Sequence, residues 1–203
     1  MKQLIIATAN SKKYKEVKKI IGGLFLDIKS LLDFNRRPVI VEDGKSFFEN
    51  AAKKAVTASL FYDSFALGED SGLEVDFLNG QPGIYSARFS GPKANDKKNI
   101  VKLLKALRKV DWKRRKARFR CSAVLAYKGK KIRRFEGALS GYITFKPEGC
   151  SGFGYDPVFY VPKLKKTLAQ VPLSVKNRLS HRYKALLKFR NYLQNYLVKT
   201  KSL

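Results

Sequence analysis

The sequence predicts a mixed α/β fold, in which a central β-sheet is flanked by helices. Short apolar runs that are typical of buried strands alternate with segments whose apolar residues recur at helical spacing. In addition, two long strand-like runs flank Lys128-Gly129-Lys130, which indicates a long β-hairpin. Segments of both kinds in one chain are typical of a sheet that buries its faces against helices.

The N-terminal half of the chain is predicted to hold three strands and two helices. The apolar run near the start ends in small residues, which is typical of a buried strand. Ser46 and Glu49 match a capping box, in which a hydroxyl and a carboxylate bind first-turn amides of a helix. The predicted strands cover residues 3–8, 25–32 and 65–68, and the predicted helices cover residues 12–21 and 46 to about 61.

The C-terminal half is predicted to hold a turn, two helices and the hairpin. Asn79-Gly80 is a strong turn signal between two strand-like runs. Asn95 and Ser180 are expected to cap one helix each. The basic run Lys113–Lys116 is most simply a solvated loop. The strand-like runs cover residues 73–78, 84–89, 118–127 and 131–145.

The length of 203 residues suggests one domain, residues 1–203, or two closely packed lobes without a clear boundary. The net charge of +27 fits a nucleic-acid partner, but the charge is spread along the chain, which favours a compositional bias. Cys121 and Cys150 lack metal-site spacing and are expected to be buried thiols. A membrane-length apolar run and a signal-peptide pattern are missing, so we expect a cytoplasmic protein.

A polar segment follows the first predicted strand and opens a helix. Small residues there let a phosphate approach the backbone, and the helix N-terminus supplies free N–H groups. The segment lacks the glycine pattern of a P-loop, so a plain strand–helix turn capped by Asn10 is an alternative interpretation. Its residues are Thr8, Ala9, Asn10, Ser11, Lys12 and Lys13.

An acidic cluster, Glu69-Asp70-Ser71-Gly72, follows the predicted strand at 65–68. Adjacent carboxylates repel each other unless a positive charge offsets them, and at a strand end a divalent cation is a natural choice. Gly72 is expected to let the chain turn sharply. An acidic turn in solvent is the alternative. Glu42 and the neighbouring Asp43 could complete a metal site or simply favour the helix start that follows.

Two further motifs lie near the C-terminus. Gly152-Phe153-Gly154-Tyr155-Asp156-Pro157 places two glycines around an aromatic residue, a pattern that suits a backbone closing on a flat ligand, although a β-bulge is equally consistent. The only histidine of the chain lies in Ser180-His181-Arg182, with Lys176 upstream. A neutral donor or acceptor role for His181 and a packing role both remain open.

Taken together, these motifs resemble the inosine triphosphatase family, also called the XTP/dITP diphosphatases. The match runs in order over almost the whole chain. Glu69 replaces the aspartate that is more usual in that family. The matching segments are Ile5–Lys13 with Glu16, Glu42-Asp43-Gly44, Phe48–Ala51, Asp70–Val75, Gly80–Arg88, Gly152–Pro157, Lys176 and Ser180–Arg182.

The resemblance implies hydrolysis of ITP, dITP or XTP to the monophosphate and pyrophosphate by a Mg²⁺-dependent, usually dimeric enzyme. It also implies an elongated α/β fold with a mixed sheet and a cleft between two lobes. Glu42 and Asp70 would hold Mg²⁺, with Glu69 a possible third ligand, and Asp70 would also be the general base. The substrate would contact Thr8–Lys13 through its triphosphate, Ser71, and, through its base, Phe153, Gly154, Tyr155, Asp156, Lys176, His181 and Arg182.

Overall fold

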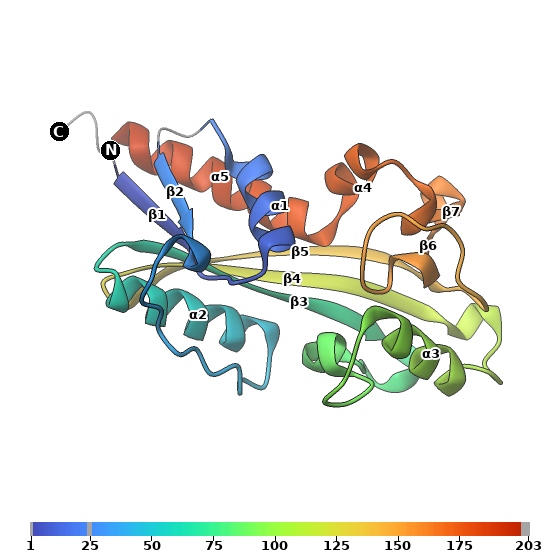
Figure 1. Ribbon diagram of the computed structural model, residues 1–203. Helices are drawn as coiled ribbons and strands as arrows, with labels where there is room; N and C mark the ends of the chain where they lie inside the picture. Colours follow the sequence, from blue (N-terminus) through green and yellow to red (C-terminus); the bar gives the residue numbers. More distant parts are fainter. Residues whose placement is uncertain (1, 24–25, 200–203) are drawn as a thin grey trace. The chain divides into compact units, whose positions relative to one another are not determined.

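The computed structural model describes residues 2–23 and 26–199 and contains a seven-stranded mixed sheet with the order β2-β1-β3-β4-β5-β6-β7 (Figure 1). Strand β1 pairs in parallel with β2 and β3, whereas β6 pairs antiparallel with β5 and β7. The strands are β1 Lys2–Ile6, β2 Leu26–Ser30, β3 Phe65–Val75, β4 Lys116–Tyr127, β5 Lys130–Ile143, β6 Phe159–Val161 and β7 Lys166–Thr167.

Helices flank the sheet, so the predicted α/β class is confirmed. The hairpin is present as well, because Lys128 and Gly129, both with positive φ, join β4 to β5. Within the described residues, no helix has the length and apolar character that a membrane span requires. The α-helices are α1 Ser11–Ile21, α2 Phe47–Phe61, α3 Asp96–Ala106, α4 Leu173–Leu179 and α5 His181–Lys199.

The chain forms two compact units. The first comprises the chain up to Asp70, Cys121–Gly137 and the chain from Arg182 onward, and the second comprises Ser71–Arg120 and Ala138–His181. Strands β3, β4 and β5 each contribute residues to both units. The chain passes from one unit to the other inside two motifs that the sequence singled out. These boundaries lie between Asp70 and Ser71 and between His181 and Arg182.

In the first unit, helices cover both faces of the sheet. Alternate residues of β1 pack on opposite sides: Leu4 and Ile6 join a cluster with α1 and α5, whereas Ile5 packs with Ala58 of α2. Helix α2 lies very close to β3, since a Cβ on Gly68 would stand 2.2 Å from the Ala51 carbonyl oxygen. This close approach places α2 side chains directly beside the residues that follow Gly68.

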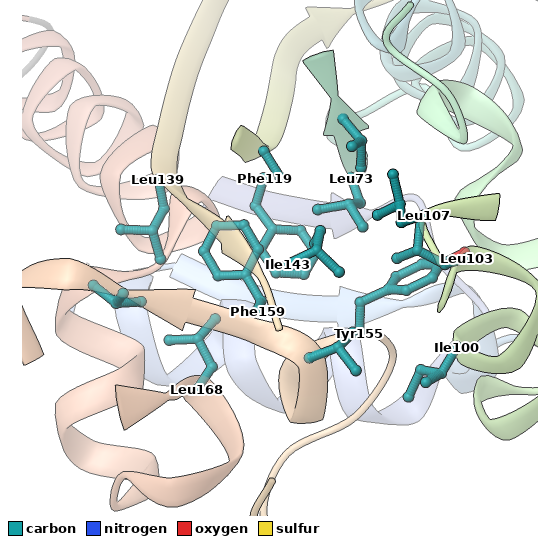
Figure 2. Close-up of a cluster of buried hydrophobic side chains, with 14 of the residues drawn as sticks. Leu73, Ile100, Leu103, Leu107, Phe119, Leu139, Ile143, Tyr155, Phe159 and Leu168 are labelled. Atoms are coloured by element: carbon teal, nitrogen blue, oxygen red, sulfur yellow. The ribbon is translucent and has the colours of Figure 1, made fainter. Parts of the chain in front are cut away.

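The second unit has its own apolar core, shown in Figure 2. Leu103 and Leu107, at the C-terminal end of α3, pack with Leu73 of β3, and the aromatic rings of Phe119 and Phe159 lie 4.5 Å apart. The core therefore joins strands β3 to β6 with α3, and it includes Tyr155, Val158 and Leu168 from the C-terminal part of the chain.

The structure corrects two predicted strands. Residues 84–88 belong to a 3-10 helix, Gly83–Arg88, and Phe89 follows it in a turn, so this segment is not a strand. Side chains satisfy its backbone there, because the Ser86 hydroxyl donates to the Gly83 carbonyl and the Asn99 amide donates to the Ser86 and Ala87 carbonyls. Strand β3 is also longer than predicted, with eleven residues, so it does not turn at Gly72.

Two further sequence interpretations are wrong. Arg115, in the run expected to be a solvated loop, is 1% exposed. Its guanidinium donates to four carbonyls and therefore joins the hairpin to the end of α3; the acceptors belong to Leu107, Val110, Ile143 and Thr144.

Cys121 is buried as expected, but Cys150 is exposed. The first residue of the strand predicted at 25–32, Phe25, lies outside the described residues, and β2 begins at Leu26.

Candidate active site

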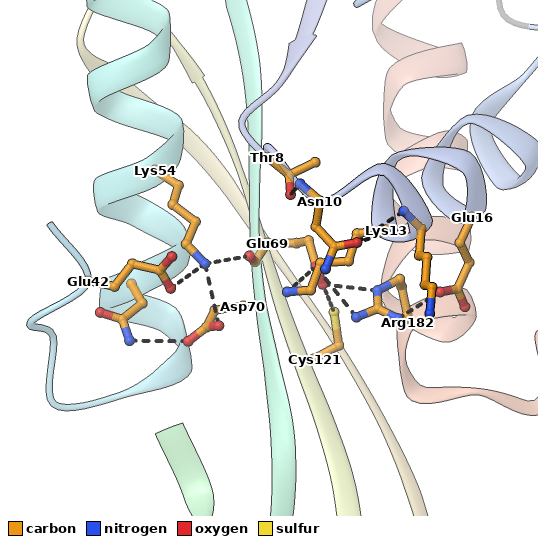
Figure 3. Close-up of polar contacts among 12 residues, drawn as sticks. Thr8, Asn10, Lys13, Glu16, Glu42, Lys54, Glu69, Asp70, Cys121 and Arg182 are labelled. Carbon is orange, nitrogen blue, oxygen red and sulfur yellow. Dashed lines mark hydrogen bonds and ion pairs between the residues drawn. The ribbon is translucent and has the colours of Figure 1, made fainter. Parts of the chain in front are cut away.

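The acidic cluster lies in the middle of β3, where successive side chains point to opposite faces of the sheet. Glu69 therefore faces α1 and α5, and Asp70 faces α2, as Figure 3 shows. Both carboxylates are buried, at 3% and 8% exposure. One segment of strand thus places two acids into two different polar environments, which is why neighbouring carboxylates are tolerated here.

Glu69 is surrounded by cations. Its carboxylate lies 3.0 Å from Lys13 Nζ of α1 and 3.1 Å from Arg182 Nε of α5, and it accepts from the Cys121 thiol at 3.4 Å. Arg182 also donates to Glu16 at 2.7 Å. Burial alone would raise the pKa of Glu69, but the positive charges of Arg182 and Lys13 outweigh it and hold that pKa well below its usual range.

The charges around Glu69 also shift the pKa values of Lys13 and Cys121. Burial alone would lower the pKa of Lys13, but the charge of Glu69 outweighs it and raises that pKa above its usual value. The pKa of the Cys121 thiol is raised well above normal by burial and by the negative charge of Glu69. The raised pKa favours the thiol form of Cys121, which donates to the Glu69 carboxylate.

Asp70 lies in a different setting on the opposite face. The Asn50 amide donates to it at 3.1 Å, and Lys54 Nζ lies 3.5 Å away; both come from α2. Lys54 Nζ also lies 2.5 Å from Glu42, and the Asn50 side-chain oxygen accepts the Gly44 N–H at 2.8 Å, which holds the segment before α2 in place. Burial raises the pKa of Asp70 above its ordinary value, despite the lowering effect of Lys54.

Two of the acidic side chains beside Lys54 suit Mg²⁺. Glu42 and Asp70 both approach one point, the Lys54 ammonium, and Glu42 is open to solvent with 42% of its side chain exposed. Two carboxylate oxygens, with the remaining positions taken by water and substrate phosphate, are a donor set typical of Mg²⁺. Within residues 2–23 and 26–199, no cluster of three or more histidine, cysteine or acidic side chains suits a metal. Glu42 and Asp70 thus fit, whereas Glu69 is engaged by two cations.

The polar segment after β1 forms the N-terminus of α1. The Asn10 side chain accepts from the N–H groups of Lys12 and Lys13 at 3.0 and 3.1 Å, and the Thr8 hydroxyl accepts the Asn10 N–H at 3.1 Å. Asn10 is therefore the helix cap, as the alternative interpretation held. A surface-accessible helix N-terminus remains suited to a phosphate. The exposed residues are Ala9, Asn10, Ser11 and Lys12.

The glycine-rich motif near the C-terminus forms a turn in the second unit. Asp156 is buried, accepts the Phe153 N–H at 2.8 Å and forms an ion pair with Lys176. Phe153 is 37% exposed, and Lys176 Nζ lies 4.3 Å from the centroid of its ring. An accessible aromatic face beside a cation and a carboxylate can stack against a flat heterocycle and hydrogen-bond to its edge.

The last predicted motif is divided between the two units. His181 is buried and stacks on Phe119 with centroids 4.8 Å apart, whereas the Arg182 guanidinium is directed at Glu69 and Glu16. Burial alone would lower the pKa of Arg182, but Glu69 and Glu16 outweigh it and raise that pKa. Ser71 is half-buried in β3.

Lys54 was not predicted as a site residue, and Asn50, although it belongs to the matching segment Phe48–Ala51, was given no role. A signal for both was available, because residues four apart lie on the same face of a helix, and the capped helix carries Asn50 and Lys54 at that spacing. A buried lysine four positions after a buried asparagine is unusual for an otherwise alanine-rich face. Only the close packing of α2 on β3 shows that both side chains meet Asp70.

Comparison with known proteins agrees with the motifs. Residues 4–192 match the model of the Ham1 family. A dITP/XTP pyrophosphatase of Halalkalibacterium halodurans is 46% identical over 95% of this chain and 100% of its own length, and one of Bacillus subtilis is 41% identical over 96% and 98%.

Solved structures extend the likeness to the fold. A HAM1 protein from Coxiella burnetii superposes with a TM-score of 0.90 at 35% identity, covering 96% of this chain and 100% of the other. The Staphylococcus aureus Ham1 protein gives a TM-score of 0.88 at 36% identity, with the same coverage. The family resemblance seen in the sequence is confirmed, and the chain belongs to the Ham1 family.

Proposed function

We propose that the protein hydrolyses the non-standard purine nucleoside triphosphates ITP, dITP and XTP to the monophosphate and pyrophosphate, and so removes them from the nucleotide pool. The observation that carries the proposal is the pair Glu69–Asp70, which brings Lys13 and Lys54 to one strand segment. The first curated relatives, named dITP/XTP pyrophosphatases, match over nearly the whole chain. The family motifs and this cluster of charges support the same reaction.

The triphosphate binds at Thr8–Lys13. The exposed end of α1 offers its positive dipole to an anion, and Lys13 adds a charge that Glu69 holds in place. Lys54, beside Asp70, adds another positive charge. Hydrolysis at the α-phosphorus builds negative charge on the phosphate oxygens and on the departing pyrophosphate, and these cations stabilise it.

Asp70 is the general base, which takes a proton from the attacking water. Its raised pKa brings the carboxyl closer to working pH, as general-base catalysis favours, and the Asn50 amide fixes its orientation. Glu42 and Asp70 would hold Mg²⁺, whereas Glu69 faces the other side of β3 and is bound by Lys13 and Arg182. When bound, the ion neutralises phosphate charge and polarises the P–O bonds.

The base is read by Phe153–Asp156 together with Lys176 and His181, all in the second unit, whereas Arg182 is bound to Glu69 and Glu16 in the first. Phe153 stacks on the purine, and donors from Lys176 and His181 face the 6-keto oxygen of hypoxanthine or xanthine. Adenine carries an amino group at that position and leaves those donors unpaired, which typically costs about 1–3 kcal/mol for each one. Ser71 contacts the substrate beside Asp70.

We further propose that residues 1–203 act as one catalytic domain in a homodimer, and that the enzyme works in the cytoplasm, where nucleotide precursors are used. The experiment that tests the function is a panel of ITP, dITP, XTP, GTP and ATP, with pyrophosphate release measured with and without Mg²⁺. We expect rapid release from the first three in the presence of Mg²⁺. If none of the five yields pyrophosphate while the protein binds RNA or DNA in a salt-sensitive way, the charge of +27 serves a nucleic acid and the proposal is wrong.

A further inference from the structure

The turn Gly152–Tyr155 in the second unit has a backbone that few residues can adopt. Gly152 and Gly154 have φ angles of +83° and +62°. A Cβ on Gly152 would also lie 2.2 Å from Asp156 Oδ2, so the backbone passes directly over that carboxylate. The turn carries Phe153, whose ring is exposed, and its shape depends on the side chains that bind its N–H groups.

Three contacts hold this turn. Asp156 accepts the Phe153 N–H from within the same segment. The Tyr155 hydroxyl donates to the Ser86 carbonyl at 2.8 Å, and the Gly154 N–H donates to Asp96 Oδ2 at 2.7 Å. Asp96 is thus a side chain from a distant part of the sequence that binds the backbone of the turn. A short hydrogen bond to a charged acceptor is among the stronger kinds.

Asp96 is not needed to cap its own helix. Asn95 performs that task for α3, because its side chain accepts the Lys98 N–H at 2.9 Å. Asp96 lies in the first turn, where its charge is favourable, and its carboxylate is directed away from the helix to Gly154. Burial and the negative charge of Asp96 raise the pKa of the Tyr155 hydroxyl, which agrees with this placement.

Side chains at the start of α3 therefore bind the backbone of two segments, the turn Gly152–Tyr155 and residues 86–90. One turn after Asp96, Asn99 binds the Ser90 N–H and the Ser86 carbonyl, and Ser86 in turn binds Tyr155. The contact from Asp96 fixes the part of the turn that immediately follows the Phe153 ring. Among the described residues, nothing lies within 4 Å of the Gly154 Cβ position, so no packed side chain on that side shares this task.

We propose that Asp96 is a positioning residue for base selection, which acts by holding the Gly154 N–H and thereby the angle of the Phe153 ring. The inference rests on the proposed function, in which this turn contacts the purine. Asp96 does not itself touch the substrate. The contact from Asp96 pre-organises the Phe153 ring for stacking before the base binds. Loss of the Asp96 carboxylate therefore weakens base discrimination rather than the chemistry on the phosphates.

The test compares Asp96→Ala with Asp96→Asn and with Asp111→Ala. Asparagine retains an oxygen that can accept the Gly154 N–H. Asp111 is an exposed aspartate of the same unit that makes no side-chain cap bond, so its replacement removes an equal charge elsewhere. For each folded variant, kcat and KM are measured for ITP and ATP with Mg²⁺, and thermal unfolding checks the fold.

We expect Asp96→Ala to lower kcat/KM for ITP roughly five- to tenfold, mainly through KM, as the loss of one hydrogen bond to a charged group suggests. The rate with ATP should hardly change, so the ITP/ATP ratio falls, and Asp96→Asn should restore most of it. An unchanged ratio in Asp96→Ala, or an equal loss for both nucleotides, would overturn the inference while leaving the function intact. Failure of the wild-type protein to cleave ITP would instead remove the proposed function.

Discussion

Replacing Glu69 with glutamine should destabilise the protein strongly, because the substitution removes the counter-charge of two cations in a buried site. The carboxylate is 3% exposed and lies 3.0 Å from Lys13 and 3.1 Å from Arg182. Removing one partner of a buried ion pair typically costs about 3–5 kcal/mol. Glutamine also turns an amide NH₂ toward the two cations, or places a single oxygen there that cannot satisfy both.

The structure favours the lower end of that range. The Lys13 side chain is 24% exposed, so its ammonium can turn toward water, and Arg182 keeps its bond to Glu16 at 2.7 Å. For a chain of this size, a loss of about 3 kcal/mol corresponds to a Tm lower by roughly 6–12 °C. Thermal unfolding at pH 7 without nucleotide measures it. A decrease of less than about 2 °C would refute this account of Glu69.

The same variant makes a prediction about pH. Because the folded pKa of Glu69 lies well below its ordinary value of 4.5, the stability from its charge is fully present above that pH. It is lost as the pH falls through the folded pKa. The difference in Tm between wild type and Glu69→Gln should therefore be constant near neutral pH and shrink in strong acid. A difference that grows as the pH falls would have the wrong sign.

Three other substitutions test the rest of the structure. Asp70→Asn should lower pyrophosphate release on the order of 100-fold or more and leave the fold intact, and a folded variant with a near-normal rate would show that Asp70 is not the base. Lys54→Met should lower kcat on the order of 100-fold, because it removes a buried cation beside Asp70. The control Lys53→Met, at an exposed neighbour that pairs with Asp43, should hardly change kcat. Equal kcat values for the two variants would exclude a role for Lys54. Arg115→Lys should lower the free energy of unfolding by about 2–4 kcal/mol, because one ammonium cannot reach all four carbonyls. Arg114→Lys, at an exposed position, is the control. If the unfolding curves of the two variants coincide, the role given to Arg115 is wrong.

Local signals in the sequence were sufficient for most of the elements. Asn10, Ser46 and Asn95 each accept the first-turn N–H groups of the helices that the sequence assigned to them. Such caps depend on residues two or three positions apart, which the sequence displays directly. The turn of the β4–β5 hairpin at Lys128 and Gly129 was equally predictable from the sequence. The order of motifs also sufficed to assign the family, because each segment kept its residues and spacing.

Long-range packing decided what the local patterns could not. The segment 84–89 alternates like a strand, yet Ser86 and Asn99 bind its backbone and make residues 84–88 part of a 3-10 helix. Arg115 looked like one of several solvated cations, but carbonyls from distant residues enclose it. In both cases some of the partners lie 13 to 29 positions away in the sequence, so no short window contains all of the information.

The sequence by itself determined the family, the α/β class and the identity of Asp70 and its neighbours as the acidic cluster. Only the tertiary structure separated the roles of the two adjacent acids. Strand geometry turns Glu69 toward α1 and α5 and Asp70 toward α2, so the first is locked between Lys13 and Arg182 while the second meets Asn50 and Lys54. Which helix covers each face of β3 depends on the folding of the whole unit, and that arrangement gives two neighbouring carboxylates opposite shifts in pKa.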